Sequence, residues 1–213
     1  AVFDGCSSGR DAHFASALVG KCLQAALKRL NDDSSVRNFS LFTDELIYQT
    51  LMNLRETRDI LMLDTPELLS TLIVFVYCPA ENVGEIIALG DGFISVNGIE
   101  YSIDQQNEPD YPAYHLDTIN TTTDLKKLVH ERGKRVMVDD MEDISISTDG
   151  IFTFELPAST DEPLGFTNPL HYLVHDRFLI HNQAMLPRKC NVMKNKYRIV
   201  NHDDIALIRI IKH

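Results

Sequence analysis

Four aspartates stand beside apolar, strand-like stretches of this chain: Asp4 in VFDG, Asp91 in ALGDG, Asp149 in ISTDG and Asp203 in NHDDIALI. Three of them precede a glycine, and a single Asp-Gly pair is most often only a turn. Four such sites favour a different interpretation, because strand ends of one sheet system can converge. Converging carboxylates repel one another unless cations lie between them.

Carboxylate and water oxygens are the ligands that Mg²⁺ and Mn²⁺ prefer. Two such ions, about 3.5–4 Å apart, are a common device for attacking a phosphoryl centre with an activated water. The glycine after an aspartate lets the backbone approach closely, so that a carbonyl oxygen can join the ligands. The pattern therefore predicts a metal-dependent phosphoryl hydrolase.

Composition narrows the class of protein. The chain has 213 residues, which predicts a single domain over residues 1–213. Its net charge of -11 predicts no nucleic-acid partner and no binding to anionic membranes, because both need a basic face. The acidic excess fits either solubility or a site that gathers carboxylates around cations.

Location is predicted from what the sequence lacks. No apolar stretch approaches the ~20 residues that span a bilayer, and no signal peptide is visible. The four cysteines are scattered without a CxxC pair, which favours reduced thiols in a cytoplasmic protein. Residue 1 is not Met and already lies in a strand-like run, so we expect a preceding strand to be missing.

The elements that must position the aspartates follow from hydrophobic periodicity. Apolar residues at helical spacing predict a helix after Gly9 and a second over 43–62 with Thr43 as N-cap. Another helix is expected from Asn168-Pro169 through LHYLVHDRFLI, and segment 104–124 is expected to be a long loop. Apolar or alternating runs predict strands in 70–77, 83–92, 93–98, 99–103, 135–140, 142–150 and 205–211.

Asn97-Gly98 is typical of a two-residue hairpin turn. The order of helices, a strand meander, further helices and a closing strand predicts sheets flanked by helices in one layered α+β domain.

The same motifs resemble a known family, the metal-dependent type 2C Ser/Thr protein phosphatases of the bacterial type. The similarity runs in order over nearly the whole chain: VFDG before a long helix, STLIVFVY, EIIALGDGFISVNG, ISISTDGI and HDDIALIRI. Each motif is short, and their order and spacing together carry the resemblance. It implies a four-layer αββα sandwich, here without its first strand, and a site for two Mg²⁺ or Mn²⁺ ions.

The resemblance also implies roles for individual residues. Asp4 would bridge the two ions, and Gly5 would offer its carbonyl to one of them. Asp149 and Asp203 would complete the ligands of the other ion, and Asp91 would bind a third, weaker one. The implied substrate is a phosphorylated protein, with a cognate kinase as a further partner in bacterial signalling.

Three departures from the family's pattern concern catalysis. The family's Asp-Gly-His-Gly-Gly is Asp4-Gly5-Cys6-Ser7-Ser8 here, so Cys6 replaces the histidine suggested as general acid. The family's upstream phosphate-binding arginine is absent, and its Gly-Asp-Ser-Arg turn has become Gly-Asp-Gly-Phe. The alternative is therefore a weak or inactive pseudophosphatase that acts as a regulatory binding module.

Other reactive side chains have simpler interpretations. Cys6 could be a nucleophile, but no arginine follows at the spacing of a CX₅R phosphate loop. His13 is expected to be a surface or packed residue of a helix. The histidines 171, 175 and 181 could suggest a metal cluster, but without a clear third ligand a solvated face is favoured. The basic residues around 126–127 and 132–135 are expected at the exposed end of a helix.

Overall fold

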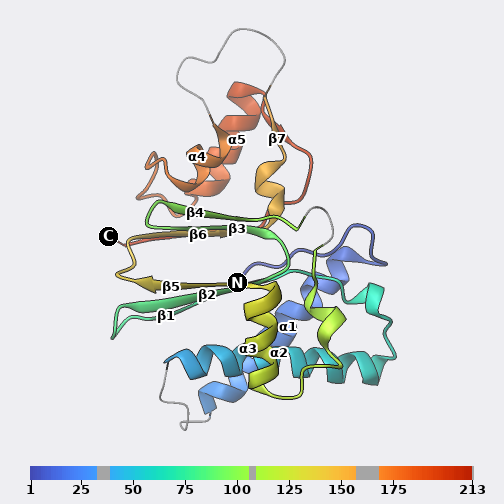
Figure 1. Cartoon of the computed structure of the whole chain (residues 1–213). Coiled ribbons are helices and arrows are strands. Elements are labelled where there is room, and N and C mark those ends of the chain that lie inside the picture. Colours follow the sequence, from blue (N-terminus) through green and yellow to red (C-terminus); the bar gives the residue numbers. More distant parts are fainter. Residues whose placement is uncertain (33–38, 106–108, 157–167, 213) are drawn as a thin grey trace.

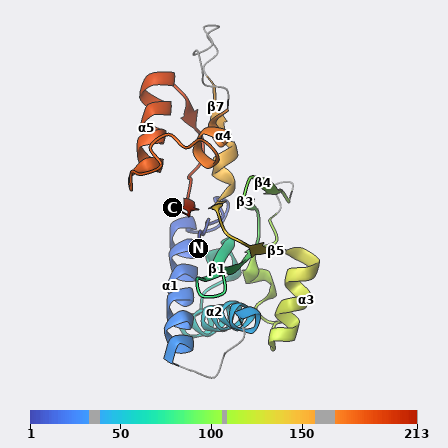
Figure 2. The same cartoon turned by 90° about the vertical axis from the view of Figure 1, so that its left-hand side faces the viewer.

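The computed structural model describes residues 1–32, 39–105, 109–156 and 168–212. Two sheets face each other in its centre, with α1, α2 and α3 beyond one sheet and α4 and α5 beyond the other (Figure 1). The view at right angles keeps α4 and α5 at the end opposite α1, α2 and α3 (Figure 2). The fold is thus an α+β protein of four layers, and the predicted αββα sandwich is confirmed.

Helices of three or more turns lie mostly in the first helical layer, and short 3₁₀ helices lie in the connections between other elements. The α-helices are α1 (Ala12–Asp32), α2 (Phe39–Leu61), α3 (Thr122–Arg132), α4 (Pro169–Val174) and α5 (Met185–Tyr197). The 3₁₀ helices are η1 (Thr65–Glu67), η2 (Pro112–His115) and η3 (Asp149–Phe152).

The two main sheets are antiparallel in every pairing that the structure describes. One has the order β1-β2-β5, with β1 (Leu72–Cys78), β2 (Val83–Leu89) and β5 (Lys134–Asp139). The other has the order β4-β3-β6-β9, with β3 (Gly92–Val96), β4 (Ile99–Ile103), β6 (Asp143–Ser147) and β9 (Leu207–Ile211). A short ribbon pairs β7 (Phe154–Glu155) with β8 (Val200–Asn201).

The apolar runs of the central strands are explained by burial on both faces. Alternate side chains of a strand point to opposite sides. In β1, Leu72 and Val74 pack with the helices, whereas Ile73 packs between the two sheets. A third core joins β3 to α4 and α5 through Phe93, Leu173 and Met193. Fully burying each such side chain contributes about 1.5–3 kcal/mol.

Strand predictions agree closely with the structure. The Asn97-Gly98 turn joins β3 to β4, with Val96 opposite Ile99 and positive φ at both turn residues. This is the conformation that a two-residue hairpin requires. Each of the seven predicted strands corresponds to an observed one, with bounds shifted by a few residues at some ends.

Helix predictions need three corrections. Thr43 is not an N-cap: α2 begins at Phe39, and the buried Thr43 hydroxyl donates to the Phe39 carbonyl inside the helix. The helix from Pro169 ends at Val174, because buried Lys189 and Arg209 bind the backbone carbonyls that follow it. The expected loop over 104–124 contains η2 and the start of α3.

The basic island is also corrected. Arg135 is not at an exposed helix end but on β5, where it pairs with the buried acids Asp44 and Glu85. Lys126 of α3 reaches the same Asp44, with its Nζ 3.1 Å from Oδ2. Among the described helices, none has the length and apolar character needed to cross a bilayer.

Candidate functional site

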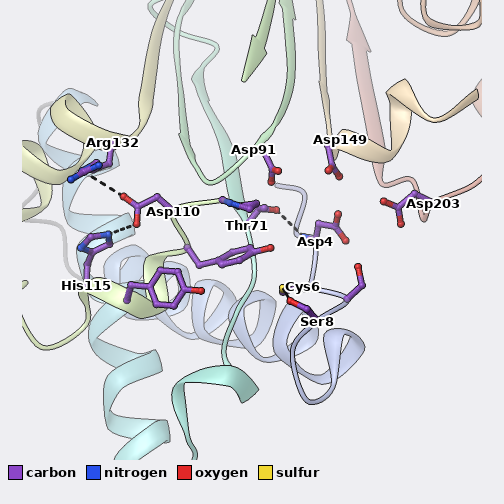
Figure 3. A pocket seen from close by; sticks show the side chains of 15 residues that line it. Asp4, Cys6, Ser8, Thr71, Asp91, Asp110, His115, Arg132, Asp149 and Asp203 are labelled. Carbon is purple, nitrogen blue, oxygen red and sulfur yellow. Dashed lines mark hydrogen bonds and ion pairs between the residues drawn. The ribbon is translucent and has the colours of Figure 1, made fainter. Parts of the chain in front are cut away.

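A pocket of about 1000 Å³ opens at one end of the facing sheets. Its lining includes all five residues predicted as metal ligands: Asp4, Gly5, Asp91, Asp149 and Asp203. Figure 3 shows the four aspartates gathered at one end of this pocket. The structure therefore brings together side chains that are as far as 199 positions apart, from Asp4 to Asp203.

Asp4 and Gly5 are positioned by pairing with the chain around β1. Val2 and Ile73 exchange backbone hydrogen bonds of 2.9 and 3.1 Å, and Gly5 forms a bridge with Ser70. Thr71 holds Asp4 from both sides: its amide donates to the Asp4 carbonyl at 2.8 Å, and its hydroxyl accepts from the Asp4 amide at 3.0 Å.

Gly5 is required by the close approach of α1. A Cβ at this position would lie 1.8 Å from the carbonyl oxygen of Ala12, so no larger residue fits without moving the helix. The Asp-Gly pair is thus a packing requirement as well as a candidate for metal binding. It places the start of α1 against Gly5, the residue that follows Asp4.

Asp149 and Asp203 are brought together by a second close contact. Asp149 begins η3 at the end of β6, and a Cβ on Gly150 would lie 2.1 Å from the Asp204 carbonyl oxygen. Thr148 closes the contact, because its amide donates to Ala206 at 3.1 Å and its hydroxyl accepts from the Ala206 amide at 3.0 Å. The glycine therefore lets the 203–204 loop lie against the end of β6.

Asp91 lies where the chain crosses from one sheet to the other. It follows β2 of the first sheet and immediately precedes β3 of the second. This crossover lies at the same end of the sandwich as the Asp4 segment, so its carboxylate enters the same pocket.

The electrostatics show that these carboxylates are crowded. Burial raises the pKa of Asp4 to about 7, helped by a hydrogen bond with Asp149 and by the charges of Asp149, Asp203 and Asp91. Burial also raises the pKa of Asp91 to about 6, followed by the charge of Asp149. Each raised pKa records a free-energy cost of keeping the group ionised without a neighbouring cation.

The donor set fits a hard divalent ion. The Asp4 and Asp149 carboxyls are within hydrogen-bonding reach of each other, and carboxylate oxygens are the ligands such ions take. No three His, Cys, Asp or Glu side chains within the described ranges converge tightly enough to hold one ion. The pair can therefore supply two carboxylate ligands, and Asp91 and Asp203 share its pocket without forming one tight cluster with it.

Cys6 is engaged by two neighbours in the pocket wall. Its Sγ lies 3.0 Å from the Ser8 hydroxyl, and it also forms a hydrogen bond with Tyr111. Burial acts to raise the pKa of the Cys6 thiol, but the hydrogen bonds with Ser8, Tyr111 and nearby amides hold it below its ordinary value. Burial and the bond to Cys6 raise the pKa of Tyr111.

Sequence reasoning missed the opposite wall of the pocket. Asp110, His115 and Arg132 lie there, at the end away from the four aspartates (Figure 3). The first two belong to the segment expected to be a long loop. Arg132 is exposed at the end of α3, as expected for the basic residues, but its place in this pocket was not expected. No motif or spacing in 104–132 signals that these residues share a pocket with Asp4.

Arg10, His13 and His175 lie outside this pocket's lining. Arg10 is exposed and lies 3.6 Å from Asp64 and 3.5 Å from Glu67. His13 is exposed on the first turn of α1 and borders a smaller neighbouring cavity. His175 contacts Glu100, with Nε2 2.6 Å from Oε1, and its ring centroid is 5.3 Å from that of His171.

Comparison with known proteins gives a family match. A sequence profile described as Protein phosphatase 2C matches residues 1–184. No curated protein matches the chain.

The solved structures that match the chain are only distantly related to it in sequence. The serine/threonine phosphatase PstP/Ppp of Mycobacterium tuberculosis is 14% identical, with a TM-score of 0.49; the match covers 99% of this chain and 87% of that one. PppA, described as a regulatory component of T6SS in Pseudomonas aeruginosa, is 15% identical, with a TM-score of 0.45 and coverages of 99% and 84%. The PstP catalytic domain in complex with two manganese ions is 14% identical, with a TM-score of 0.44 and coverages of 94% and 83%.

Proposed function

The chain belongs to the protein phosphatase 2C family, and we propose that it hydrolyses phosphoserine and phosphothreonine in proteins with Mg²⁺ or Mn²⁺ as cofactor. The observation that carries the proposal is the lining of one pocket by Asp4, Asp149 and Asp203, which come from three separate segments. Unpaired carboxylates in a partly buried pocket need cations, and a phosphoryl group is a substrate for which such cations are suited.

Each ligand has a proposed task. Asp4 would bridge two ions, with the Gly5 carbonyl on one and Asp149 and Asp203 on the other, and Asp91 would serve a third ion. When bound, the ions would neutralise charge on the phosphoryl oxygens and lower the pKa of the attacking water. The chain's own contribution is positioning: Thr71 fixes the Asp4 backbone, and the Gly150 contact fixes the 203–204 loop beside Asp149.

A second function is favoured by the environment of Cys6. The thiol stands where the family has a histidine, and it is bonded to Ser8 and Tyr111. A chain that lacks this acid could bind metal and phosphoprotein yet turn over weakly or not at all, as a regulatory binding module. A single domain over 1–213, a cytoplasmic setting and a cognate kinase remain predictions.

Hydrolysis of p-nitrophenyl phosphate and of a phosphoserine peptide, with and without Mn²⁺, separates the two functions. We expect Mn²⁺-dependent turnover that Asp149→Ala abolishes. Asp59→Ala is the matched control, because Asp59 is an exposed aspartate outside the pocket. Turnover that is independent of metal or unaffected by Asp149→Ala would contradict the enzymatic proposal. Mn²⁺ binding without turnover would support the regulatory module.

A further inference from the structure

The end of the pocket opposite the four aspartates carries a charged group of its own. Asp110 Oδ1 lies 2.7 Å from His115 Nε2, and Asp110 Oδ2 lies 3.7 Å from Arg132 Nε. Figure 3 shows Asp110, His115 and Arg132 together, well apart from Asp4 and Asp203. The pocket is therefore a trough with two chemically different ends.

Arg132 is the available cation of this trough. It is the only Lys or Arg among the described residues that line the pocket, and its side chain is 65% exposed. Its contact with Asp110 is too long for a hydrogen bond, and Asp110 is held more closely by His115. The guanidinium can therefore accept an anionic partner from outside, with the planar donor geometry that suits carboxylate and phosphate.

Two tyrosines connect the ends. Tyr111 is bonded to Cys6 beside the proposed metal site, and Asp110 precedes it directly in the chain. The ring of Tyr114 packs edge-on against that of Tyr111, with centroids 5.9 Å apart, and remains 53% exposed. An exposed aromatic ring between a phosphate site and a cation gives an extended peptide an apolar surface on which to lie.

We propose that Arg132 forms a subsite for a second anionic group of the phosphoprotein substrate, displaced along the chain from the phosphoserine. The chemistry is that of an Asp or Glu carboxylate or of another phosphate. In this proposal the far end, lined by Asp4, Asp91, Asp149 and Asp203, is taken by the metal ions and the phosphoserine itself. The subsite rests on one part of the proposed function, namely that a phosphoprotein enters this pocket.

Peptide binding tests the subsite separately from catalysis. Fluorescence anisotropy with the Mn²⁺-loaded full chain would compare peptides in which a non-hydrolysable phosphonate replaces the phosphoserine and which carry one glutamate, one lysine or only alanines around it. The substituted position is moved through about five residues on each side, since an extended chain spans about 3.3 Å per residue. We expect glutamate at one position to tighten binding about fivefold, the upper range for an exposed ion pair.

Charge reversal identifies the residue responsible. Arg132→Glu should invert the preference at that position, so that the lysine peptide binds more tightly than the glutamate peptide. Arg10→Glu is the matched control, because Arg10 is 66% exposed, also faces acidic partners and lies outside the pocket lining. A non-hydrolysable phosphonate at the preferred position then shows whether a second phosphate binds better than a carboxylate.

The outcomes distinguish this subsite from the proposed reaction. Equal affinity for the glutamate and alanine peptides at every position, a preference that survives Arg132→Glu, or no peptide binding at all would each overturn the subsite. A glutamate preference that depends on Arg132 in a protein without turnover would uphold the subsite and remove the enzymatic function.

Discussion

Two groups of acidic side chains in this molecule differ in whether the chain supplies them with a cation. Between the helices and the first sheet, buried Asp44 and Glu85 are joined by Arg135, and Lys126 adds a contact to Asp44. We call these four residues the ion cluster. Every acid in it has a cation supplied by the chain itself, as a buried charge requires.

Among the described residues, no Lys or Arg pairs with the pocket aspartates, Asp4, Asp91, Asp149 and Asp203. Arg132, the single Lys or Arg of the described lining, is at the other end beside Asp110. The raised pKa values of Asp4 and Asp91 reflect this imbalance, with burial as the main cause in both. The chain neutralises the acids that hold its layers together and leaves the acids of the pocket for a cation from solution.

The largest effect on stability is expected from breaking the ion cluster. Arg135→Met should lower the free energy of unfolding by about 3 kcal/mol, because removing one partner leaves buried charge uncompensated. Urea denaturation of the metal-free protein measures this change. The double variant Arg135→Met/Glu85→Leu should recover part of the loss, since the Arg135–Glu85 pair is then gone and Asp44 keeps its contact with Lys126. A loss that is the same in the single and double variants would show that packing, not charge, explains the effect.

Neutralising a pocket aspartate should instead affect activity. Asp4→Asn should lower the rate of Mn²⁺-dependent p-nitrophenyl phosphate hydrolysis at least about 100-fold, because even indirect supports of a metal site contribute that much. Its metal-free stability should not fall, since no ion pair is lost. A destabilised Asp4→Asn protein, judged by urea denaturation, would contradict the contrast between the two groups.

Added metal should act on the pocket alone. At a Mn²⁺ concentration about ten times the dissociation constant, the wild-type protein should gain about 1.4 kcal/mol of stability. Asp149→Asn should lose most of this gain, whereas Arg135→Met should keep it, because its pocket is intact. Thermal unfolding with and without Mn²⁺ measures both variants, and an equal gain in all three proteins would indicate binding elsewhere.

The layered fold was predictable because its central strands, β2 and β3 above all, are buried on both faces. STLIVFVY and EIIALG are continuous apolar runs of the kind that lie between two layers, and Asn97-Gly98 specifies its hairpin locally. Helix ends were less predictable, since they depend on distant partners. The helix after Pro169 ends where Lys189 and Arg209 take its last carbonyls, and neither cation is near it in sequence.

The acidic end of the site could be proposed from sequence because each aspartate sits at a strand end beside a glycine or a second aspartate. The sequence could not show why residues 5 and 150 must be glycine. Both allow a backbone contact with a remote segment, Gly5 with Ala12 and Gly150 with Asp204. No sequence motif indicated that the opposite end of the pocket would contain Asp110, His115 and Arg132. His115 and Arg132 reach the pocket only through the course of the chain from β4 to α3.

The smallest expected effect comes from two substitutions whose changes in stability should have opposite signs. Asp91→Asn in metal-free protein at neutral pH should raise stability by about 0.5 kcal/mol after solvent screening, because burial and the charge of Asp149 disfavour the ionised form. Asp143→Asn should lower stability, because Asp143 makes two hydrogen bonds, of 3.0 and 2.7 Å, to the fully buried Arg209 side chain. Urea denaturation of both variants gives the two signs. If both variants lost stability, the pocket aspartates would be as well compensated as Asp143, and the need for an external cation would disappear.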